Sequence, residues 1–182
     1  MSRIEALTIE SATPEGAQIL TAIKGKIGMV PNLYASMAHS PAALSAALAF
    51  GDAMGKSSLS AAVKEQLALV IAGTNTCDYC ASAHTAIGKG AGVNAEELGK
   101  NLNGQASDPK VQALLTLART IVESRGKLAD SDLEAARGAG VTEGEIVEVV
   151  ASVAINTFTN YFNHIAETEI DFPVVTTASA VS

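Results

Sequence analysis

The chain has 182 residues, of which 48% are hydrophobic and 17% charged, so it carries enough apolar sequence for one buried core and too much for a disordered tail. Its 12 basic residues are outnumbered by 19 acidic ones, and a formal charge of -7 argues against a nucleic-acid partner. The first ten residues carry three charges, and no later apolar run approaches the roughly 18 residues of a membrane span. We therefore expect a cytoplasmic protein without a membrane partner.

Apolar residues recur at helical spacing in nearly every segment, and no stretch shows the sustained alternation of a strand. The sequence therefore predicts an all-α fold, a compact helical bundle. The predicted helices run from Pro14 to about Lys26, up to about His39, from Pro41 to about Met54, from about Ser60 to Gly73, from Cys77 to about Gly90, and over roughly 94–103, 108–125, 130–138 and 142–167. Thr74, Asn75 and Thr76 are expected to supply the turn and the N-cap before Cys77.

We expect a single domain over 1–182, with a CxxC-bearing half at about 41–92. An offset of 80 residues places Glu65 on Glu145 and His84 on His164. This register indicates either an internal duplication, with a degenerate repeat at about 108–167, or a chance alignment of two helices rich in Ala and Val. The C-terminal tail, 171–182, lacks the residues that mark the start or end of a helix, and we expect it to extend over a neighbour or to fray.

The two cysteines of the chain, Cys77 and Cys80, lie at the start of a predicted helix, and His84 follows one turn after Cys80. Residues four apart are neighbours on a helix, so the His84 ring can reach the sulfur of Cys80, and Cys77 is close enough for a local disulfide. Unpaired N–H groups and the helix dipole favour a thiolate in this first turn.

Glu65 can be placed by counting along the two predicted helices that flank Asn75. If they form an antiparallel hairpin, Glu65 and His84 both lie roughly 13 to 16 Å from the turn and face each other, whereas Cys80 lies only about 7 Å from it. A carboxylate on one imidazole nitrogen fixes the tautomer and raises the basicity of the other nitrogen. The count therefore predicts that Glu65 acts through His84 and not directly on sulfur.

The spacing of Glu65, Cys77, Cys80 and His84 resembles the signature of the alkylhydroperoxidase AhpD family, within the wider carboxymuconolactone decarboxylase-like superfamily. Segments 28–32 (GMVPN), 160–164 (NYFNH) and 171–173 (DFP) resemble the peroxidase-related branch of that superfamily. The resemblance implies a thiol-dependent peroxidase that reduces hydrogen peroxide or organic hydroperoxides through a Cys77–Cys80 disulfide cycle. It implies Cys80 as the peroxidatic cysteine, Cys77 as the resolving one, His84 as the base and Glu65 as its relay. An external dithiol, of the lipoyl type or on a thioredoxin-like protein, would restore the pair.

One residue departs from the family pattern, because Tyr79 stands where the best-known AhpD proteins have a histidine before the second cysteine. Two other classes stay open: a decarboxylase or isomerase of the same superfamily acting on a lactone, and a non-enzymatic redox sensor. A metal site is disfavoured because a structural zinc site takes four ligands and no second ligand pair follows the CxxC. No flavin or nicotinamide motif is present in the sequence, so we expect no cofactor.

The mean hydropathy of +0.25 is high for a chain with no tryptophan and few other aromatic residues. A chain of this composition is expected to expose apolar surface that another subunit can bury. We therefore expect a homo-oligomer, and the family resemblance favours a trimer or a hexamer.

Overall fold

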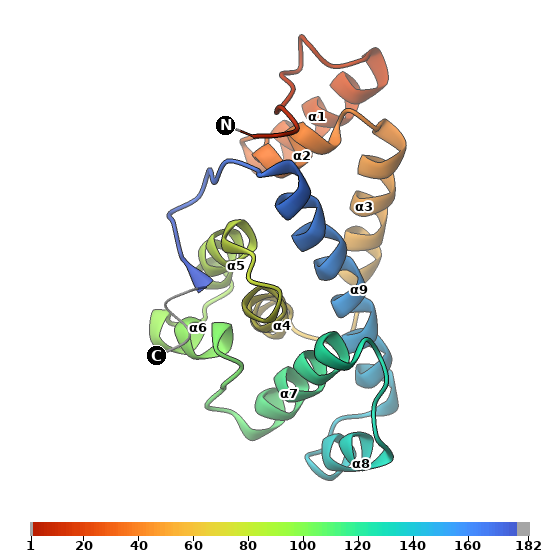
Figure 1. The fold of residues 1–182 in the computed structure, drawn as a ribbon, viewed down its shortest axis with the longest axis vertical. Helices are drawn as coiled ribbons and strands as arrows, with labels where there is room; N and C mark the ends of the chain where they lie inside the picture. Colours follow the sequence, from red (N-terminus) through yellow and green to blue (C-terminus); the bar gives the residue numbers. More distant parts are fainter. Residues whose placement is uncertain (1, 178–182) are drawn as a thin grey trace.

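The protein is described by a computed structural model over residues 2–177, and this part of the chain holds nine α-helices and no strand (Figure 1). The helices are α1 (Pro14–Ile27), α2 (Asn32–Met37), α3 (Pro41–Met54), α4 (Ala61–Thr74), α5 (Asp78–Gly90), α6 (Ala95–Leu102), α7 (Pro109–Ser124), α8 (Asp130–Gly138) and α9 (Glu143–Ala166). The predicted all-α fold is confirmed. Over the same residues, no helix is both long enough and apolar enough to cross a membrane.

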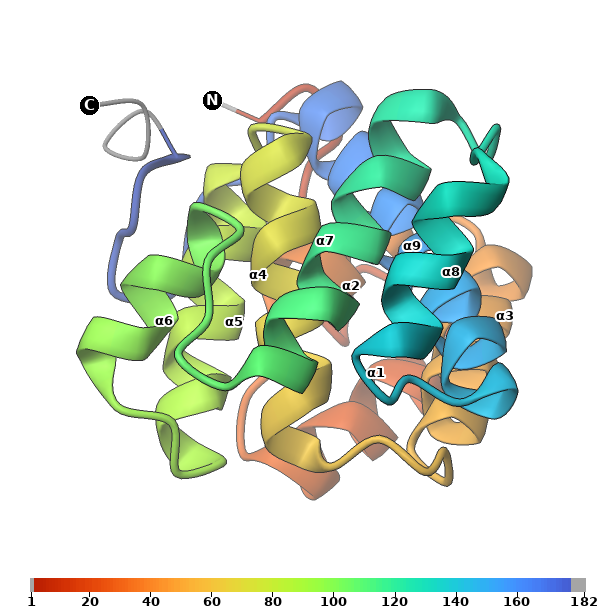
Figure 2. The same cartoon turned by 90° about the horizontal axis from the view of Figure 1, so that it is seen from below.

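Helix α4 lies at the centre of the bundle, where it packs against α5, α6, α7 and α9 (Figures 1 and 2). All seven residues from Gln66 to Ala72 are buried. A helix that is apolar on every side can only be stable inside the protein, so the sequence of α4 fits its central position. The partners of the polar side chains of α4, such as Glu65, are therefore set by the helices packed around it.

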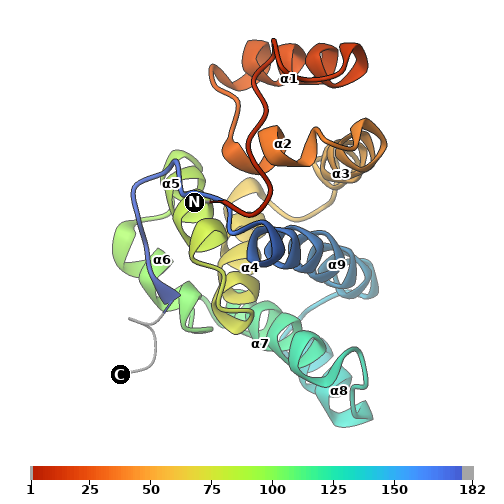
Figure 3. The ribbon, with the colours of Figure 1, turned by 45° about the horizontal axis from the view of Figure 1, so that its top comes forward.

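Helices α1, α2 and α3 gather on one side of α4 and α9, and α7 and α8 lie on the other (Figure 3). The buried side chains form two clusters that follow this division. One cluster joins α1–α3 to α5 and α6 and contains both cysteines. The other joins α4, α7, α8 and α9. The two predicted redox cysteines thus lie within the first cluster.

The helix ends follow the local signals in the sequence. Thr13 and Ser40 cap α1 and α3 before a first-turn proline, and Gly28 ends α1 with a φ of 83°, which favours glycine. Thr142 and Glu145 form the predicted capping box of α9. One expectation was wrong: the N-cap of α5 is Cys77 itself and not one of the three polar residues before it.

The segments paired by the 80-residue offset have different structures. Glu65 and His84 stand on two helices joined by a turn, whereas Glu145 and His164 stand on the single helix α9. Glu145 serves as the capping residue of α9 and pairs with Lys110 at 2.8 Å. The offset therefore relates residue types but not a shared hairpin.

The part of the predicted tail within the described residues, 171–177, packs on α5 of its own chain. Ser82 Oγ accepts a hydrogen bond from the Val175 N–H at 2.9 Å, and Asp78 Oδ1 accepts two from Thr177, each at 2.7 Å. The remainder of that tail, 178–182, lies outside the described residues.

Candidate active site

The turn between α4 and α5 places the two cysteines. Asn75 ends α4, Thr76 takes a left-handed conformation with a φ of 55°, and Cys77 has the extended backbone of an N-cap. The Cys80 N–H donates a hydrogen bond to Cys77 Sγ at 3.4 Å. Sulfur thus occupies the position in which a serine or aspartate oxygen normally satisfies the first N–H groups of a helix. A thiolate there gains from the same N–H groups and from the helix dipole.

Glu65 on α4 meets His84 on α5, as the hairpin count predicts. The distance between His84 Nδ1 and Glu65 Oε2 is 2.7 Å, and the two side chains are only 23% and 18% exposed. A carboxylate can only accept, so in the neutral ring Nδ1 carries the proton and Nε2 is left as the basic nitrogen. The pair is therefore built to hold one imidazole tautomer in a partly dry site.

Two asparagines of α9 complete the surroundings of the sulfurs. Asn163 Nδ2 donates to Cys80 Sγ at 3.2 Å, and Asn160 Oδ1 accepts from Asn75 Nδ2 at 2.9 Å. Asn160 is fully buried and Asn163 is 4% exposed. Sequence reasoning gave neither residue a place at the dithiol. The available signal was two amides one turn apart within a helix, where asparagine is unfavourable unless it has a buried partner.

Both cysteines are free thiols, so the structure represents the dithiol form, and the predicted disulfide remains a prediction. Among residues 2–177, the side-chain hydrogen bond at Cys80 Sγ comes from Asn163, while the His84 ring bonds Glu65. His84 thus lies one turn from Cys80, and among the described residues no hydrogen bond joins its ring to that sulfur in this form. Delivery of a proton from Cys80 to His84 needs a small approach of the two groups or an intervening substrate atom.

The pKa values of the two thiols are shifted in opposite directions. Hydrogen bonds from Cys80 lower the pKa of Cys77, although burial opposes this shift. The pKa of Cys80 is raised well above its usual range, first by its hydrogen bond to Cys77 and then by burial. Asn163 and Asn160 act in the opposite direction and lower the pKa of Cys80. The resting thiolate is thus favoured at Cys77, and the implied peroxidatic role of Cys80 requires that its proton first be moved.

Two hollows lie beside the N-terminal part of α5. The first, which we name the apolar cavity, has a volume of about 430 Å³ and extends between α1, α2, α3 and α5. Its lining includes Leu33, Leu48, Ala83, His84, Ile87 and Phe172. The second, which we name the Cys77 cleft, has a volume of about 330 Å³ and is lined by Thr76, Cys77, Asp78, Tyr79, Asn163, His164, Glu167, Thr168 and Ile170.

Tyr79 lines both hollows and is only 4% exposed. Its hydroxyl accepts a hydrogen bond from the Leu33 N–H at 3.2 Å, and the edge of its ring meets Phe172 at a centroid distance of 5.8 Å. Burial raises the pKa of Tyr79. At the position where the family has histidine, this chain therefore has a neutral side chain that fixes the CxxC turn to α2 and to the 171–177 segment.

No three His, Cys, Asp or Glu side chains come together over residues 2–177 in an arrangement that could hold a metal ion. The titratable side chains that the described site brings together are two thiols, a histidine and a carboxylate. The sequence predicted these four side chains, and the fold adds the amides of α9.

Comparisons with known proteins agree with this architecture. A model of the carboxymuconolactone decarboxylase family matches residues 41–123. Among solved structures, a peroxidase-related protein with an AhpD core from Ralstonia eutropha JMP134 has a TM-score of 0.84 at 23% identity, with 93% of this chain and 92% of that chain covered. A peroxidase-related protein from Silicibacter sp. TM1040 has a TM-score of 0.79 at 22% identity, with 92% of each chain covered.

A third structure of similar fold is the debrominase Bmp8, with a TM-score of 0.78, 19% identity, and coverage of 98% of this chain and 95% of that chain. No curated protein matches the sequence. The family match covers residues 41–123, and the structural similarity shows that the chain has the AhpD-like fold.

Proposed function

We propose that the protein is a thiol-dependent peroxidase that reduces hydroperoxides through a Cys77–Cys80 dithiol/disulfide cycle. The observation that carries the proposal is the 2.7 Å contact between Glu65 and His84, one helical turn beyond a CxxC pair at a helix start. A base held in one tautomer next to a thiol is the arrangement that activates a sulfur nucleophile. A structural role for the pair would not need it.

In the first step, the Cys80 proton passes to His84 Nε2, and the Cys80 thiolate attacks the terminal oxygen of the hydroperoxide. The O–O bond breaks, the alkoxide takes the proton from His84 and leaves as an alcohol, and Cys80 becomes a sulfenic acid. Glu65 holds the ring and stabilises its charged form. Cys80 is oxidised by two electrons, and the peroxide is reduced by two.

In the second step, Cys77 attacks the sulfur of Cys80. The S–S bond forms, the S–O bond breaks, and hydroxide leaves with the Cys77 proton as water. Two thiols and one hydroperoxide thus give one disulfide, one alcohol and one water. An external dithiol then restores both thiols and is itself oxidised to a disulfide.

A second candidate is reductive dehalogenation of a small apolar ring. The debrominase Bmp8 shares the fold, and one structure of its variant holds 2,3,4-tribromopyrrole. The observation that favours this candidate is the apolar cavity, which His84 lines beside the dithiol. The same two electrons would replace a carbon–bromine bond by a carbon–hydrogen bond, with release of bromide and formation of the disulfide.

One set of assays separates the candidates. Purified protein is mixed with hydrogen peroxide, cumene hydroperoxide or a bromopyrrole, with and without dithiothreitol, and consumption of each compound is measured. Dithiol-dependent loss of a hydroperoxide is the expected result. Bromide release without peroxide turnover would support the dehalogenase. Oxidation of the pair without turnover would indicate a redox sensor, and turnover of a lactone without dithiol would indicate a decarboxylase or isomerase.

We further propose that the protein is a homo-oligomer, a trimer or a hexamer. Large apolar side chains stand exposed along α9 at spacings of three, four and eight residues: Val147, Val150, Phe158, Tyr161 and Ile165. The most exposed of them, Val147 and Ile165, are 67% and 64% accessible. An apolar stripe of this length supports burial against another subunit. Light scattering that gives a mass near 18.5 kDa at micromolar concentration would contradict the proposal.

A further inference from the structure

The linings of the two hollows beside α5 have one side chain in common. Tyr79 lines both, and its Leu33 hydrogen bond and Phe172 contact hold it in place from two directions. A ring so fixed and so deeply buried acts as a partition. A molecule in the apolar cavity therefore does not share space with a molecule in the Cys77 cleft.

The sulfurs are distributed unequally between the two hollows. Cys77 lines the cleft that carries its name, whereas Cys80 lines neither hollow and accepts the Asn163 hydrogen bond. Along α5, Cys80 shares one helix face with Ala83, His84 and Ile87, which stand three, four and seven residues further on. All three of those residues line the apolar cavity. Both residues are buried, but Cys77, 1% exposed, contributes to the wall of the cleft, whereas Cys80, 2% exposed, lies behind the wall of the cavity.

From this arrangement we infer that the two half-reactions use separate access routes. The hydroperoxide reaches the cysteine pair from the apolar cavity. The external dithiol enters the Cys77 cleft and reduces the disulfide by attack on Cys77 Sγ. The inference rests on the proposed peroxidase function. It adds which sulfur the reductant attacks and from which side.

The chemistry of reduction fits this direction of attack. A thiolate of the reductant bonds to Cys77 Sγ, the Cys77–Cys80 bond breaks, and Cys80 leaves as a thiolate. Asn163 Nδ2, at 3.2 Å from that sulfur, is already placed to donate to the leaving thiolate. The second thiol of the reductant then attacks the mixed disulfide, which releases the Cys77 thiolate and the oxidised reductant, while Cys80 takes up a proton.

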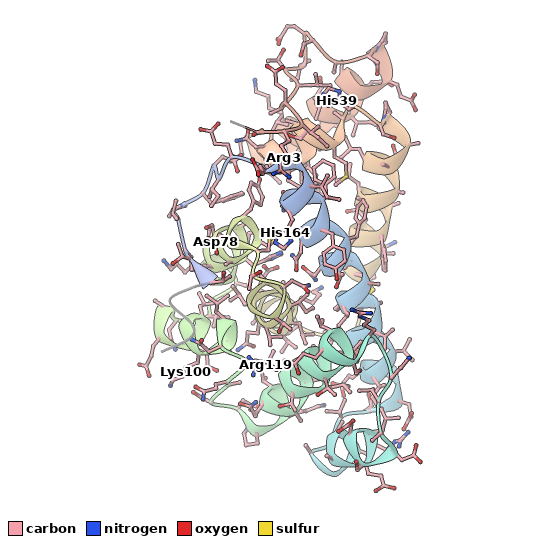
Figure 4. All side chains as sticks on the ribbon, viewed as in Figure 1. Arg3, His39, Asp78, Lys100, Arg119 and His164 are labelled. Carbon is pink, nitrogen blue, oxygen red and sulfur yellow. The ribbon has the colours of Figure 1, made fainter. Side chains whose placement is uncertain are left out.

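The polarity of the two hollows also differs in the required sense. Asp78, His164 and Glu167 line the cleft, and His164 Nε2 lies 3.3 Å from the carbonyl oxygen of Thr76. Both carboxylates have partners: Glu167 pairs with Arg3 at 2.7 Å, and Asp78 accepts from Thr177. The apolar cavity has one ion pair at its wall, Lys26–Asp52 at 3.0 Å, among mainly apolar side chains, so an ionic nucleophile keeps more of its hydration in the cleft. Figure 4 labels Asp78 on α5 and His164 on the neighbouring α9, and both line the cleft.

One substitution is designed to block the Cys77 cleft and another to block the apolar cavity. His164→Trp enlarges an exposed side chain in the cleft wall, and His39→Trp is its matched control, because His39 is also exposed and lies toward the α1 end of the molecule (Figure 4). Gly51→Trp fills the apolar cavity from α3, where an added Cβ would meet nothing within 4 Å. Gly99→Trp on α6 is its control, with equally open space around the Cβ.

The two half-reactions are measured separately by quenched thiol labelling: oxidation of the dithiol by cumene hydroperoxide, and reduction of the disulfide by dithiothreitol. We expect His164→Trp to slow reduction alone and Gly51→Trp to slow oxidation alone, each by about 10-fold or more, the scale of a steric pocket contact. The controls should match the wild type, and circular dichroism verifies folding. If both blocking variants slow the same half-reaction, or if neither slows the half-reaction expected for it, the inference of two access routes is wrong.

A peroxide-free arm keeps this test separate from the proposed function. In Cys80→Ser the disulfide reagent DTNB should label Cys77 at least about 10-fold faster than it labels Cys80 in Cys77→Ser. Adding His164→Trp should slow the first labelling, and adding Gly51→Trp should not. If peroxide does not oxidise the pair but this labelling pattern is found, the proposed peroxidase function is wrong, and the proposed access to Cys77 from the cleft still holds. Faster labelling of Cys80 would overturn the inference whatever the peroxide result.

Discussion

The α4–α5 hairpin and helix α9 carry similar residues in the same register, and only the hairpin assembles an acid–base pair. Glu65 and His84 are 19 residues apart and meet at 2.7 Å. Glu145 and His164 have the same separation along one continuous helix, which at 1.5 Å per residue puts them about 28 Å apart. Spacing alone therefore does not make the site; the turn between the two residues does.

The cause lies in four residues. Thr74, Asn75, Thr76 and Cys77 form the turn in the hairpin, and the positions that correspond in α9 are 154–157, Ala-Ile-Asn-Thr, which remain helical. The Asn75 side chain bonds Asn160, and Thr76 adopts a left-handed conformation, so the hairpin turn is held in place by α9. The longer helix contributes no acid–base pair, but it supplies the amides that the dithiol needs.

The largest expected effect comes from removing the sulfurs, which the hairpin has and α9 lacks. Cys80→Ser should abolish peroxide reduction, because the attacking sulfur is lost. Cys77→Ser should leave a sulfenic acid on Cys80 that a dimedone probe traps for mass spectrometry. A sulfenic acid found on Cys77 in Cys80→Ser would reverse the roles, in line with the lowered pKa of Cys77.

Removing the acid–base pair should lower the rate of oxidation by something on the order of 10²-fold, the usual scale for such a group. We expect Glu65→Gln and His84→Ala to cause similar losses in single-turnover oxidation, and the double variant to be little worse than either, because the two act as one unit. Glu145→Gln, the counterpart in α9, is the control and should react like the wild type. Fully additive losses at positions 65 and 84 would mean that the two side chains act independently.

A third expectation concerns Gly73 in α4, whose backbone packs closely on α6, a contact that the corresponding position of α9 does not make. A Cβ on Gly73 would fall against the Leu102 carbonyl oxygen of α6, whereas the residue that corresponds in α9 is Val153. Gly73→Ala should therefore lower the free energy of unfolding by about 2 kcal/mol, the middle of the range for overpacking. Gly99→Ala, with open space around its Cβ, should instead be neutral or stabilising. Equal urea midpoints for the two variants would contradict the close packing of α4 on α6.

The smallest effect should come from the amide that α9 lends to the hairpin. Asn163 lowers the pKa of Cys80, so in a Cys77→Ser background Asn163→Leu should raise it. The thiolate absorbance at 240 nm would then appear at higher pH, and oxidation at neutral pH should slow by about 10-fold, which corresponds to about 1.4 kcal/mol. Asn156→Leu changes an amide of α9 that bonds Ser152 and serves as the control. An unchanged titration in Asn163→Leu would show that the amide does not stabilise the Cys80 thiolate.

The sequence by itself predicted the helices, their caps and four of the side chains at the site, because each of these depends on residues within a few turns of one another. Helical periodicity and caps are local, and Glu65 could be set level with His84 because a tight turn fixes the register of two helices. The family resemblance rested on the same short spacing, and the family model that matches the chain covers residues 41–123. That spacing equally paired Glu145 with His164, and nothing local in it distinguished a turn from a continuous helix.

The tertiary structure decided everything that depends on partners distant in the chain. Asn163 reaches Cys80 across 83 residues, and Thr177 reaches Asp78 across 99. Tyr79 separates the two hollows only because Leu33 and Phe172 come to it from opposite ends of the chain. Such contacts arise from the packing of whole helices around α4, and the free energy of that packing is a property of the assembled core and not of any segment.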